Sequence, residues 1–212
     1  MQILIADYQA IPRIGLKGLL LSAYPDATII EAESFSDIIT MAEDNAPDLI
    51  ILELNTFGYH IFSGFSTIKN QFPKIPIVIF TSHESNYYAI NLFKLGISGY
   101  FTKDCSTEEF TQALDFVLKN KKKYISTSLA NLLVDRIQPS NENKYLHLHL
   151  TNQEFEILRL LSQGKSLAFI SNKMALQLNG VTHSKYKIFK TLKIHNEYEV
   201  FKYASLNLGM AY

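Results

Sequence analysis

The chain has 212 residues, of which 47% are hydrophobic, and its 20 basic and 20 acidic residues give a formal net charge of zero. This length allows one large domain or two small ones, and the hydrophobic share is enough to bury a core in each. The apolar runs are far shorter than a membrane span, and the single cysteine, Cys105, excludes an internal disulfide. The chain begins with a strand-like segment rather than an export signal, so we expect a cytoplasmic protein that does not enter a membrane.

The charges are distributed unevenly between the two halves of the chain. Residues 1–124 hold 10 basic against 14 acidic side chains, whereas residues 125–212 hold 10 against 6. An acidic first half followed by a basic second half suggests that the second half meets a polyanion. Ordinary scatter of surface charge would give a similar excess, so the motifs must decide.

Strand and helix patterns alternate through the first 120 residues. Short apolar runs rich in branched side chains predict strands, and apolar positions three or four residues apart predict helices. Strands are expected at residues 2–6, 27–31, 49–54, 76–81 and 99–102, and helices at about 11–20, 35–43, 64–71, 85–95 and 107–119. Five alternating units predict a doubly wound, five-stranded parallel sheet of the α/β class.

Polar side chains stand at the carboxyl ends of four predicted strands. Asp7 follows the first strand, Glu53 ends the third, Thr81 ends the fourth and Lys103 follows the fifth. In an open α/β sheet, ligands bind in the crevice where the strand order reverses. If the order reverses between the first and third strands, two acids, a hydroxyl and an ammonium converge there as a candidate site.

These residues resemble the receiver domain of bacterial response regulators over roughly residues 1–120. The resemblance is carried by Pro47-Asp48-Leu49-Ile50-Ile51-Leu52-Glu53-Leu54, Phe80-Thr81-Ser82 and Leu95-Gly96-Ile97-Ser98-Gly99-Tyr100-Phe101-Thr102-Lys103-Asp104. It implies a phosphoacceptor at position 53, phosphoryl-oxygen ligands at Thr81 and Lys103, and a switch aromatic at Tyr100. It also implies Mg²⁺ held by a pair of acids after the first strand, and a histidine kinase as partner.

The sequence departs from this receiver pattern at three places. The acceptor position holds Glu53 rather than aspartate, and its extra methylene should move the carboxylate roughly 1.5 Å further into the crevice. A misplacement of about 1 Å can slow an in-line transfer ~10²-fold. Tyr8 stands at the second metal-binding acid, so an Mg²⁺ site at Asp7 and Glu53 would be weak, and no cofactor is expected. The usual Met-Pro after the acceptor is replaced by Thr56-Phe57, and together these losses predict a degenerate receiver that works without phosphorylation.

Two hypotheses remain for Glu53. In the first, its longer carboxylate pairs with Lys103 and approaches Thr81, so that its charge imitates part of a phosphoaspartate and holds an active-like state. A phosphoryl group brings about −2 charge and three acceptors, so the imitation would be partial. In the second, the crevice has lost its function and the domain survives as a dimerisation scaffold.

The second half of the chain has helical patterns almost throughout. Residues 126–137 read as an amphipathic helix and residues 138–144 as a polar, turn-rich boundary. Thr151 and Glu154 form a capping box that opens a helix ending near Gly164, and further helices are expected at about 167–174, 181–192 and 197–208. Four short helices joined by brief turns predict an all-α helix-turn-helix domain. The predicted divisions are a receiver-like domain at 1–122, a linker helix and linker at 123–147, and the helix-turn-helix domain at 148–212.

Residues 148–210 resemble the LuxR/NarL-type DNA-binding domain. The matching residues are Leu150-Thr151-Asn152-Gln153-Glu154-Phe155-Glu156-Ile157-Leu158, then Gly164, Ser166, Ile170, Val181, Ile188, Leu192, Glu199 and Ala204. With a receiver-like domain in front, the domain order resembles that of a NarL-type response regulator. The resemblance implies a homodimeric transcription regulator that binds double-stranded DNA and is not an enzyme.

In such a module the third helix enters the major groove. The helical repeat turns Val181, Ser184, Ile188, Thr191 and Leu192 toward the core, and it turns outward the DNA-contact candidates Thr182, His183, Tyr186, Lys187 and Lys190. The lysines suit phosphates, which set affinity, and the other three suit base edges. A merely solvated polar face would show the same pattern. The family's Thr-Val-Lys-x-His is replaced by Gly180-Val181-Thr182-His183-Ser184, so one DNA-contacting lysine is missing.

The sequence therefore predicts a DNA-binding transcription regulator of an atypical NarL type that acts independently of phosphorylation. Two alternatives stay open. The protein could titrate other regulators through its receiver face, or Glu53 or a nearby residue could still accept phosphate slowly.

Overall fold

The computed structural model describes residues 1–57, 61–82, 86–127, 129–131, 134 and 145–208. The chain divides into two compact units. The first comprises Met1–Glu84 and Leu92–Thr127, and the second comprises Ser85–Asn91 and Ser128–Tyr212.

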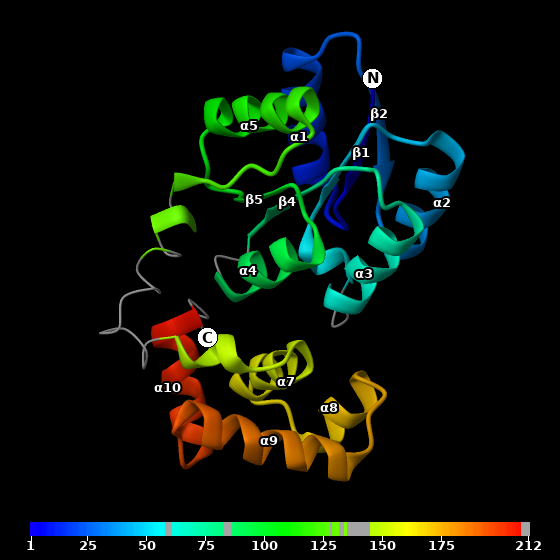
Figure 1. Cartoon of the computed structure of the whole chain (residues 1–212). Coiled ribbons are helices and arrows are strands. Elements are labelled where there is room, and N and C mark those ends of the chain that lie inside the picture. The colour runs from blue at the N-terminus through cyan, green and yellow to red at the C-terminus, as the bar shows by residue number, and fades with distance from the viewer. Residues whose placement is uncertain (58–60, 83–85, 128, 132–133, 135–144, 209–212) are drawn as a thin grey trace. The chain divides into compact units, whose positions relative to one another are not determined.

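A five-stranded parallel sheet forms the centre of the first unit (Figure 1). Its strands are β1 (Gln2–Ala6), β2 (Thr28–Ala32), β3 (Leu49–Leu52), β4 (Ile77–Thr81) and β5 (Gly99–Thr102). Their order in the sheet is β2-β1-β3-β4-β5, and all neighbours run parallel. The order reverses between β1 and β3, so the predicted doubly wound α/β sheet is confirmed.

Helices cover both faces of this sheet. They are α1 (Ala10–Ala23), α2 (Phe35–Asn45), α3 (Ile61–Gln71) and α5 (Thr107–Asn120), with a short 3₁₀ helix η1 at Leu54–Phe57. Helix α4 (Asn86–Leu95) is divided between the units, because residues 86–91 belong to the second and residues 92–95 to the first. Figure 1 shows α1 and α5 on one face and α2 and α3 on the other. The hydroxyls of Ser34 and Ser106 accept backbone N–H groups of Asp37 and Glu109 and so fix where α2 and α5 begin.

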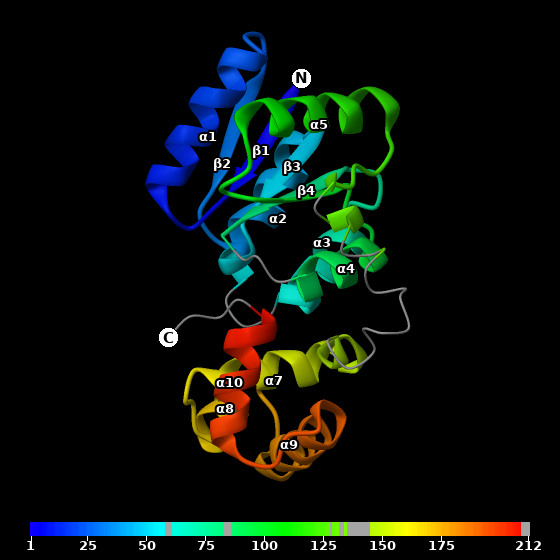
Figure 2. The same cartoon turned by 90° about the vertical axis from the view of Figure 1, so that its left-hand side faces the viewer.

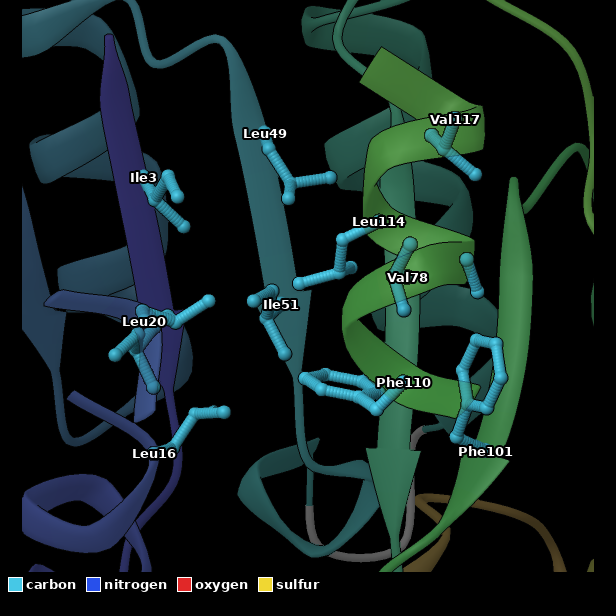
Figure 3. Close-up of a cluster of buried hydrophobic side chains, with 12 residues drawn as sticks. Ile3, Leu16, Leu20, Leu49, Ile51, Val78, Phe101, Phe110, Leu114 and Val117 are labelled. Atoms are coloured by element: carbon cyan, nitrogen blue, oxygen red, sulfur yellow. The ribbon is translucent and has the colours of Figure 1, made fainter. Parts of the chain in front are cut away.

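The core between the sheet and the α1–α5 layer follows from strand alternation. Every second residue of a strand points to the same face, and the central strands are buried on both faces, which explains their continuous apolar runs. The cluster on the α1–α5 side draws on β1, β3, β4, β5, α1 and α5 and is shown in Figure 3. Its largest members include Ile3, Leu16, Leu20, Leu49, Ile51, Val78, Phe101, Phe110, Leu114 and Val117. This packed layer holds the carboxyl ends of the strands in fixed positions.

The second unit is helical (Figure 2). It contains the 3₁₀ helix η3 (Leu146–His149) and the helices α7 (Asn152–Ser162), α8 (Leu167–Lys173), α9 (Leu178–Leu192) and α10 (Glu197–Leu208). Helix α7 packs against α8, α9 and α10, and α8 packs against α9. The predicted domain of four helices is confirmed.

The start of α7 agrees with the capping box predicted from the sequence, whereas the start of α9 differs from its prediction. The hydroxyl of Thr151 accepts the backbone N–H of Glu154, and the Glu154 carboxylate accepts the N–H of Thr151 at 2.8 Å, so the capping box is formed. Helix α9, however, begins at Leu178 rather than at Val181. The N–H of Val181 donates to the Gln177 carbonyl and closes a helical turn that includes Gly180. A glycine costs about 1 kcal/mol inside a helix but does not end it.

Part of the predicted linker lies outside the described residues. This holds for the polar boundary at 138–144 and for half of the amphipathic helix predicted at 126–137. Within the described ranges, no helix combines the length and the hydropathy that crossing a bilayer would need.

Candidate functional site

Four of the predicted polar residues meet at the carboxyl edge of the sheet. Asp7 directly follows β1, Glu53 follows β3, Thr81 ends β4 and Lys103 follows β5. The strands β1 and β3 are neighbours, and the N–H of Glu53 donates to the Ala6 carbonyl at 2.8 Å, so the two acids follow adjacent strand ends. Asp7 and Glu53 are only 4% and 2% exposed, which means that their carboxylates need partners within the protein.

Both oxygens of the Glu53 carboxylate have such partners. Its Oε1 accepts the Thr81 hydroxyl at 2.6 Å and the backbone N–H of Asn55 at 3.2 Å, and the Asn55 amide lies 3.4 Å away. Its Oε2 lies 2.8 Å from the ammonium of Lys103. The carboxylate is thus bound by a hydroxyl, a backbone amide and a cation, all from this chain.

Lys103 joins the two acids into one cluster. Its Nζ lies 2.6 Å from Asp7 Oδ2 and 2.8 Å from Glu53 Oε2. Burial alone would lower the pKa of this ammonium, but the hydrogen bonds to Asp7 and Glu53 outweigh burial and raise that pKa above its ordinary value. The cation therefore stays charged and balances part of the negative charge of the two carboxylates.

The two predicted tyrosines of the site are placed differently. Tyr100, on β5, is buried, and burial together with the negative charge of Glu53 raises the pKa of its hydroxyl far above the ordinary value. Tyr8 follows Asp7 on the way to α1, and it is 51% exposed. The structure therefore packs Tyr100 into the interior near Glu53 and leaves the Tyr8 side chain half in solvent.

The two acids at which the sequence predicts a weak Mg²⁺ site are both bound to a cation of the chain itself. The Lys103 ammonium lies within 2.8 Å of a carboxylate oxygen of both Asp7 and Glu53, the two acids that such an ion would need. Tyr8 brings no carboxylate to the same segment. Within the part of the chain that the structure describes, no three His, Cys, Asp or Glu side chains gather closely enough to hold a metal. An ion at Asp7 and Glu53 would have to compete with a cation that belongs to the chain.

Sequence reasoning missed two residues that shape this cluster. Arg13 of α1 is buried, and its guanidinium donates to the Asp7 carbonyl at 2.8 Å and pairs with Glu31 and Glu33 beside β2. The sequence feature that could indicate such a partner is a basic residue at an inward-facing position of a helix. Asn55, which donates to Glu53, was visible only as a polar residue two positions after the strand-end acid.

The second candidate site is the surface of α8 and α9. The turn between them is held by Ser171, whose hydroxyl donates to the Leu176 carbonyl at 2.7 Å and whose own carbonyl accepts the Leu176 N–H. On α9 the predicted core positions Val181, Ile188 and Leu192 are buried, whereas Ser184 and Thr191 are only partly buried. Four predicted contact residues are exposed, namely His183, Tyr186, Lys187 and Lys190, and Tyr186 is 71% exposed.

Two of the predicted contact residues have partners within the chain. Thr182 is partly buried, and its hydroxyl donates to the Leu178 carbonyl at 3.0 Å. The ammonium of Lys187 lies 3.0 Å from the Glu154 carboxylate on α7. Burial would raise the pKa of Glu154, but hydrogen bonds from the Thr151 backbone and from Lys187 lower it below the ordinary value. Lys187 is nevertheless exposed, as the helical projection predicts; the projection does not show that its long side chain also reaches Glu154.

Comparison with known families agrees with this arrangement of domains. The family model of the response regulator receiver domain matches residues 3–115, and that of the bacterial regulatory proteins of the luxR family matches residues 148–204. The response regulator GacA of Pseudomonas aeruginosa is 24% identical over 200 residues, which cover 94% of this chain and 92% of GacA. The response regulator UvrY of Escherichia coli K12 is 22% identical over 199 residues, which cover 93% of this chain and 90% of UvrY.

Solved structures share the fold over almost the whole length. RcsB from Salmonella enterica serovar Typhimurium, bound to promoter rprA in the presence of the phosphomimetic BeF₃⁻, is 20% identical with a TM-score of 0.75, and the match covers 97% of this chain and 98% of RcsB. Another RcsB structure, from Salmonella typhimurium, gives 21% identity and a TM-score of 0.76 with 98% of each chain covered. The chain therefore belongs to the response regulator family, with a receiver domain ahead of a regulatory domain of the luxR family.

Proposed function

We propose that this protein is a dimeric, DNA-binding transcription regulator whose receiver domain has a degenerate phosphorylation site and acts without phosphorylation. The single observation that supports action without phosphorylation is that both oxygens of the Glu53 carboxylate are bound by groups of this chain. The Thr81 hydroxyl and the Lys103 ammonium, which would serve a phosphoryl group in a working receiver, lie 2.6 and 2.8 Å from the Glu53 carboxylate.

The geometry of Glu53 favours partial imitation of a phosphorylated acceptor over a crevice without function. Burial requires partners for the Glu53 carboxylate in any case, but its two partners, the Thr81 hydroxyl of β4 and the Lys103 ammonium after β5, are the groups that the receiver pattern assigns to a phosphoryl group. The carboxylate also sits beside Tyr100, which is buried. We infer that Glu53 holds Thr81, Lys103 and Tyr100 in the arrangement that activates this domain.

The DNA-binding part of the proposal rests on the helix-turn-helix unit. Its α9 presents His183, Tyr186 and Lys190 on one exposed side, a mixture of hydrogen-bonding, aromatic and cationic groups suited to base edges and phosphates. The structural relatives include RcsB bound to promoter DNA and two RcsB dimers bound to two parallel DNAs. We propose the same partner, double-stranded DNA, and the same dimeric state for this chain, which would place it in the cytoplasm.

Binding of genomic DNA fragments by the untreated protein across a series of salt concentrations tests the proposal. We expect a few fragments to bind far more tightly than the bulk, with affinity falling steeply as salt rises, because phosphate contacts release counterions. Weak binding that is uniform over all fragments would contradict a sequence-specific regulator that needs no phosphate.

The variant Glu53→Gln tests the role of the crevice. It keeps the size of the side chain but removes the charge that faces Lys103. If Glu53 holds an active-like state, Glu53→Gln should weaken DNA binding or dimerisation, and Lys122→Gln, on an exposed segment after α5, should leave both unchanged. Equal affinities of Glu53→Gln and the unchanged protein would favour the scaffold hypothesis instead.

One observation supports the alternative of a protein that titrates other regulators. Thr182 stands where the family has a DNA-contacting lysine, and Lys187 is paired with Glu154, so α9 is short of cations for DNA. Uniform weak binding in the fragment experiment would point to that role. A slow phosphorylation of Glu53 or a neighbour, with a histidine kinase as partner, is the remaining alternative, and it predicts a gain in mass after treatment with acetyl phosphate and Mg²⁺.

A further inference from the structure

The first turns of helix α4 belong to the second unit. Residues 86–91 group with the helix-turn-helix unit, whereas residues 92–95 of the same helix group with the sheet. The two tyrosines of this segment, Tyr87 and Tyr88, are both fully buried. A tyrosine buried this completely needs apolar contacts for its ring and a hydrogen-bond partner for its hydroxyl. Both tyrosines find such partners on α7 and directly before it.

Tyr87 packs against Phe155 of α7. The two rings are nearly parallel, with their centroids 3.6 Å apart and an interplanar angle of 6°. The Tyr87 hydroxyl donates to the Leu150 carbonyl at 3.1 Å, just before α7 begins. Burial, together with the negative charges of Glu156 and Glu154, raises the pKa of this hydroxyl far above its ordinary value. The hydroxyl therefore keeps its proton and remains a donor.

Tyr88 binds a buried carboxylate on the same helix. Its hydroxyl donates to Glu156 Oε1 at 2.9 Å, and Glu156 Oε2 lies 2.9 Å from Arg159 Nε. Glu156 and Arg159 are only 4% and 8% exposed, so the carboxylate depends on partners within the protein. The Tyr88 ring also meets the Phe155 ring edge to face, with the centroids 5.3 Å apart. The segment of α4 therefore gives α7 both an aromatic contact and a hydrogen-bond donor.

Helix α7 in turn supports α9, the helix predicted to enter the major groove. Every residue of α7 from Glu154 to Ser162 is buried, and α7 packs against α9. The Glu154 carboxylate also binds the Lys187 ammonium of α9 at 3.0 Å. While the α4 segment is packed on α7, Tyr186 of α9 is still 71% exposed. The segment thus covers α7 without covering this DNA-contact candidate.

We propose that Tyr87 and Tyr88 are positioning residues for DNA binding, because they complete the core of the helix-turn-helix unit and hold α7 where α9 packs on it. The proposal rests on the proposed function, since it presupposes that this unit binds DNA. The four helices α7 to α10 come from little more than the range 145–208, and a domain of about 60 residues buries too little surface to be more than marginally stable. Two large aromatic side chains enlarge that core. The helix-turn-helix unit therefore depends on a segment from the first half of the chain.

Binding of a labelled genomic fragment by full-length variants tests Tyr87, at a temperature where circular dichroism shows every variant folded. Tyr87→Leu removes the stacked ring and the hydroxyl. The DNA affinity should fall about three- to tenfold, because the apparent affinity follows the fraction of molecules in which α7 and α9 are correctly packed. The slope of log affinity against log salt should stay unchanged, since no phosphate contact is removed. Tyr87→Phe keeps the stacked ring and should recover most of the affinity, and the control Tyr198→Leu, at a 76% exposed tyrosine of α10, should keep all of it.

Hydrogen exchange of the α7 amides measures how tightly the α4 segment holds this helix. Tyr88→Phe keeps the ring but removes the donor to Glu156, and the loss of a hydrogen bond to a buried charge should speed exchange in α7 roughly tenfold. Exchange in strands β1 and β3 of the sheet should keep its rate, because neither strand belongs to this unit. Equal α7 exchange in Tyr88→Phe and the unchanged protein would exclude Tyr88 from the positioning residues.

The outcomes separate this inference from the function on which it rests. An unchanged DNA affinity in Tyr87→Leu, with the original protein binding DNA, would overturn the inference and leave the proposed function intact. A higher affinity in Tyr87→Leu would also overturn it, because the α4 segment would then restrain DNA binding instead of supporting it. Failure of the original protein to bind any fragment would overturn both.

Discussion

The crevice of the receiver and the α8–α9 surface use charged groups in opposite ways. In the crevice, Asp7, Glu53 and Lys103 come from three different strand ends and lie in or near the interior, and both acids bind Lys103. On α8 and α9, Lys165, Lys173 and Lys190 are exposed. A buried charge that loses its partner is costly, whereas an exposed one is solvated by water. Substitutions in the crevice should therefore change the free energy of unfolding, whereas substitutions on the helical surface should change the affinity for DNA.

The largest expected effect comes from removing the cation of the crevice. Lys103→Met leaves the carboxylates of Asp7 and Glu53 buried without their cation, and we expect a loss of roughly 3–5 kcal/mol in the free energy of unfolding. Urea denaturation followed by circular dichroism measures it. The matched surface variant Lys190→Met should change stability by less than about 0.5 kcal/mol. Equal, small effects of the two variants would break the contrast between the two regions.

Removing the hydroxyl that faces Glu53 should have the next largest effect. Thr81→Val keeps the shape of the side chain but deletes the donor 2.6 Å from the carboxylate, and hydrogen bonds to charged groups contribute about 1.5–3 kcal/mol. The same denaturation measurement applies. Thr81→Ser keeps a hydroxyl and should recover most of the loss; a Ser variant as unstable as the Val variant would show that packing, rather than the hydrogen bond, is responsible.

On the helical surface we expect a binding effect without a stability effect. Tyr186→Ala should reduce the ratio of specific to non-specific DNA affinity about fivefold, on the order of 1 kcal/mol, and leave the unfolding midpoint unchanged. Tyr198→Ala serves as control, because Tyr198 is a similarly exposed tyrosine on α10. An unchanged specificity ratio in Tyr186→Ala would remove this residue from the base-reading set.

The smallest effect is expected at the pair that joins α7 and α9. Glu154→Gln keeps a capping side chain but removes the charge facing Lys187, which is largely exposed, so we expect about 0.5 kcal/mol at pH 7. The pKa of Glu154 is lowered by folding, so its charge stabilises the fold above the unfolded value of about 4.3, and this contribution is lost as pH falls through the folded pKa. Denaturation at pH 7 and pH 3 should show the two proteins converging at the lower pH. A difference that persists at pH 3 would mean that the charge is not its cause.

The fold and the main members of the crevice could be predicted from the sequence. Buried strands have a strong apolar signature, and parallel strands bring their carboxyl ends to one edge, so the positions of Asp7, Glu53, Thr81 and Lys103 along the chain were enough to place them together. A prediction from strand ends considers only the residues at those ends, so it does not identify a hydrogen-bond partner that a helix contributes. The sequence analysis therefore does not include Arg13 of α1, which donates to the backbone carbonyl of Asp7.

The helical surface was less predictable for a different reason. A helical projection ranks residues by direction alone, and it correctly turned Tyr186 and Lys190 outward. It cannot show that the flexible side chain of Lys187 reaches back to Glu154, or that Lys165 and Lys173 share the ring of Phe169. The partner of a long side chain depends on tertiary packing, and the local sequence pattern carries no information about that packing.

The measurement that tests the central claim most directly compares DNA binding before and after treatment with acetyl phosphate and Mg²⁺, with the intact mass recorded on the same samples. If Glu53 already occupies the partners that a phosphoryl group would use, the mass should stay unchanged and the tightest genomic fragment should bind with the same affinity in both samples. A gain of one phosphoryl group together with tighter DNA binding would contradict the account and restore this receiver to the phosphorylation cycle.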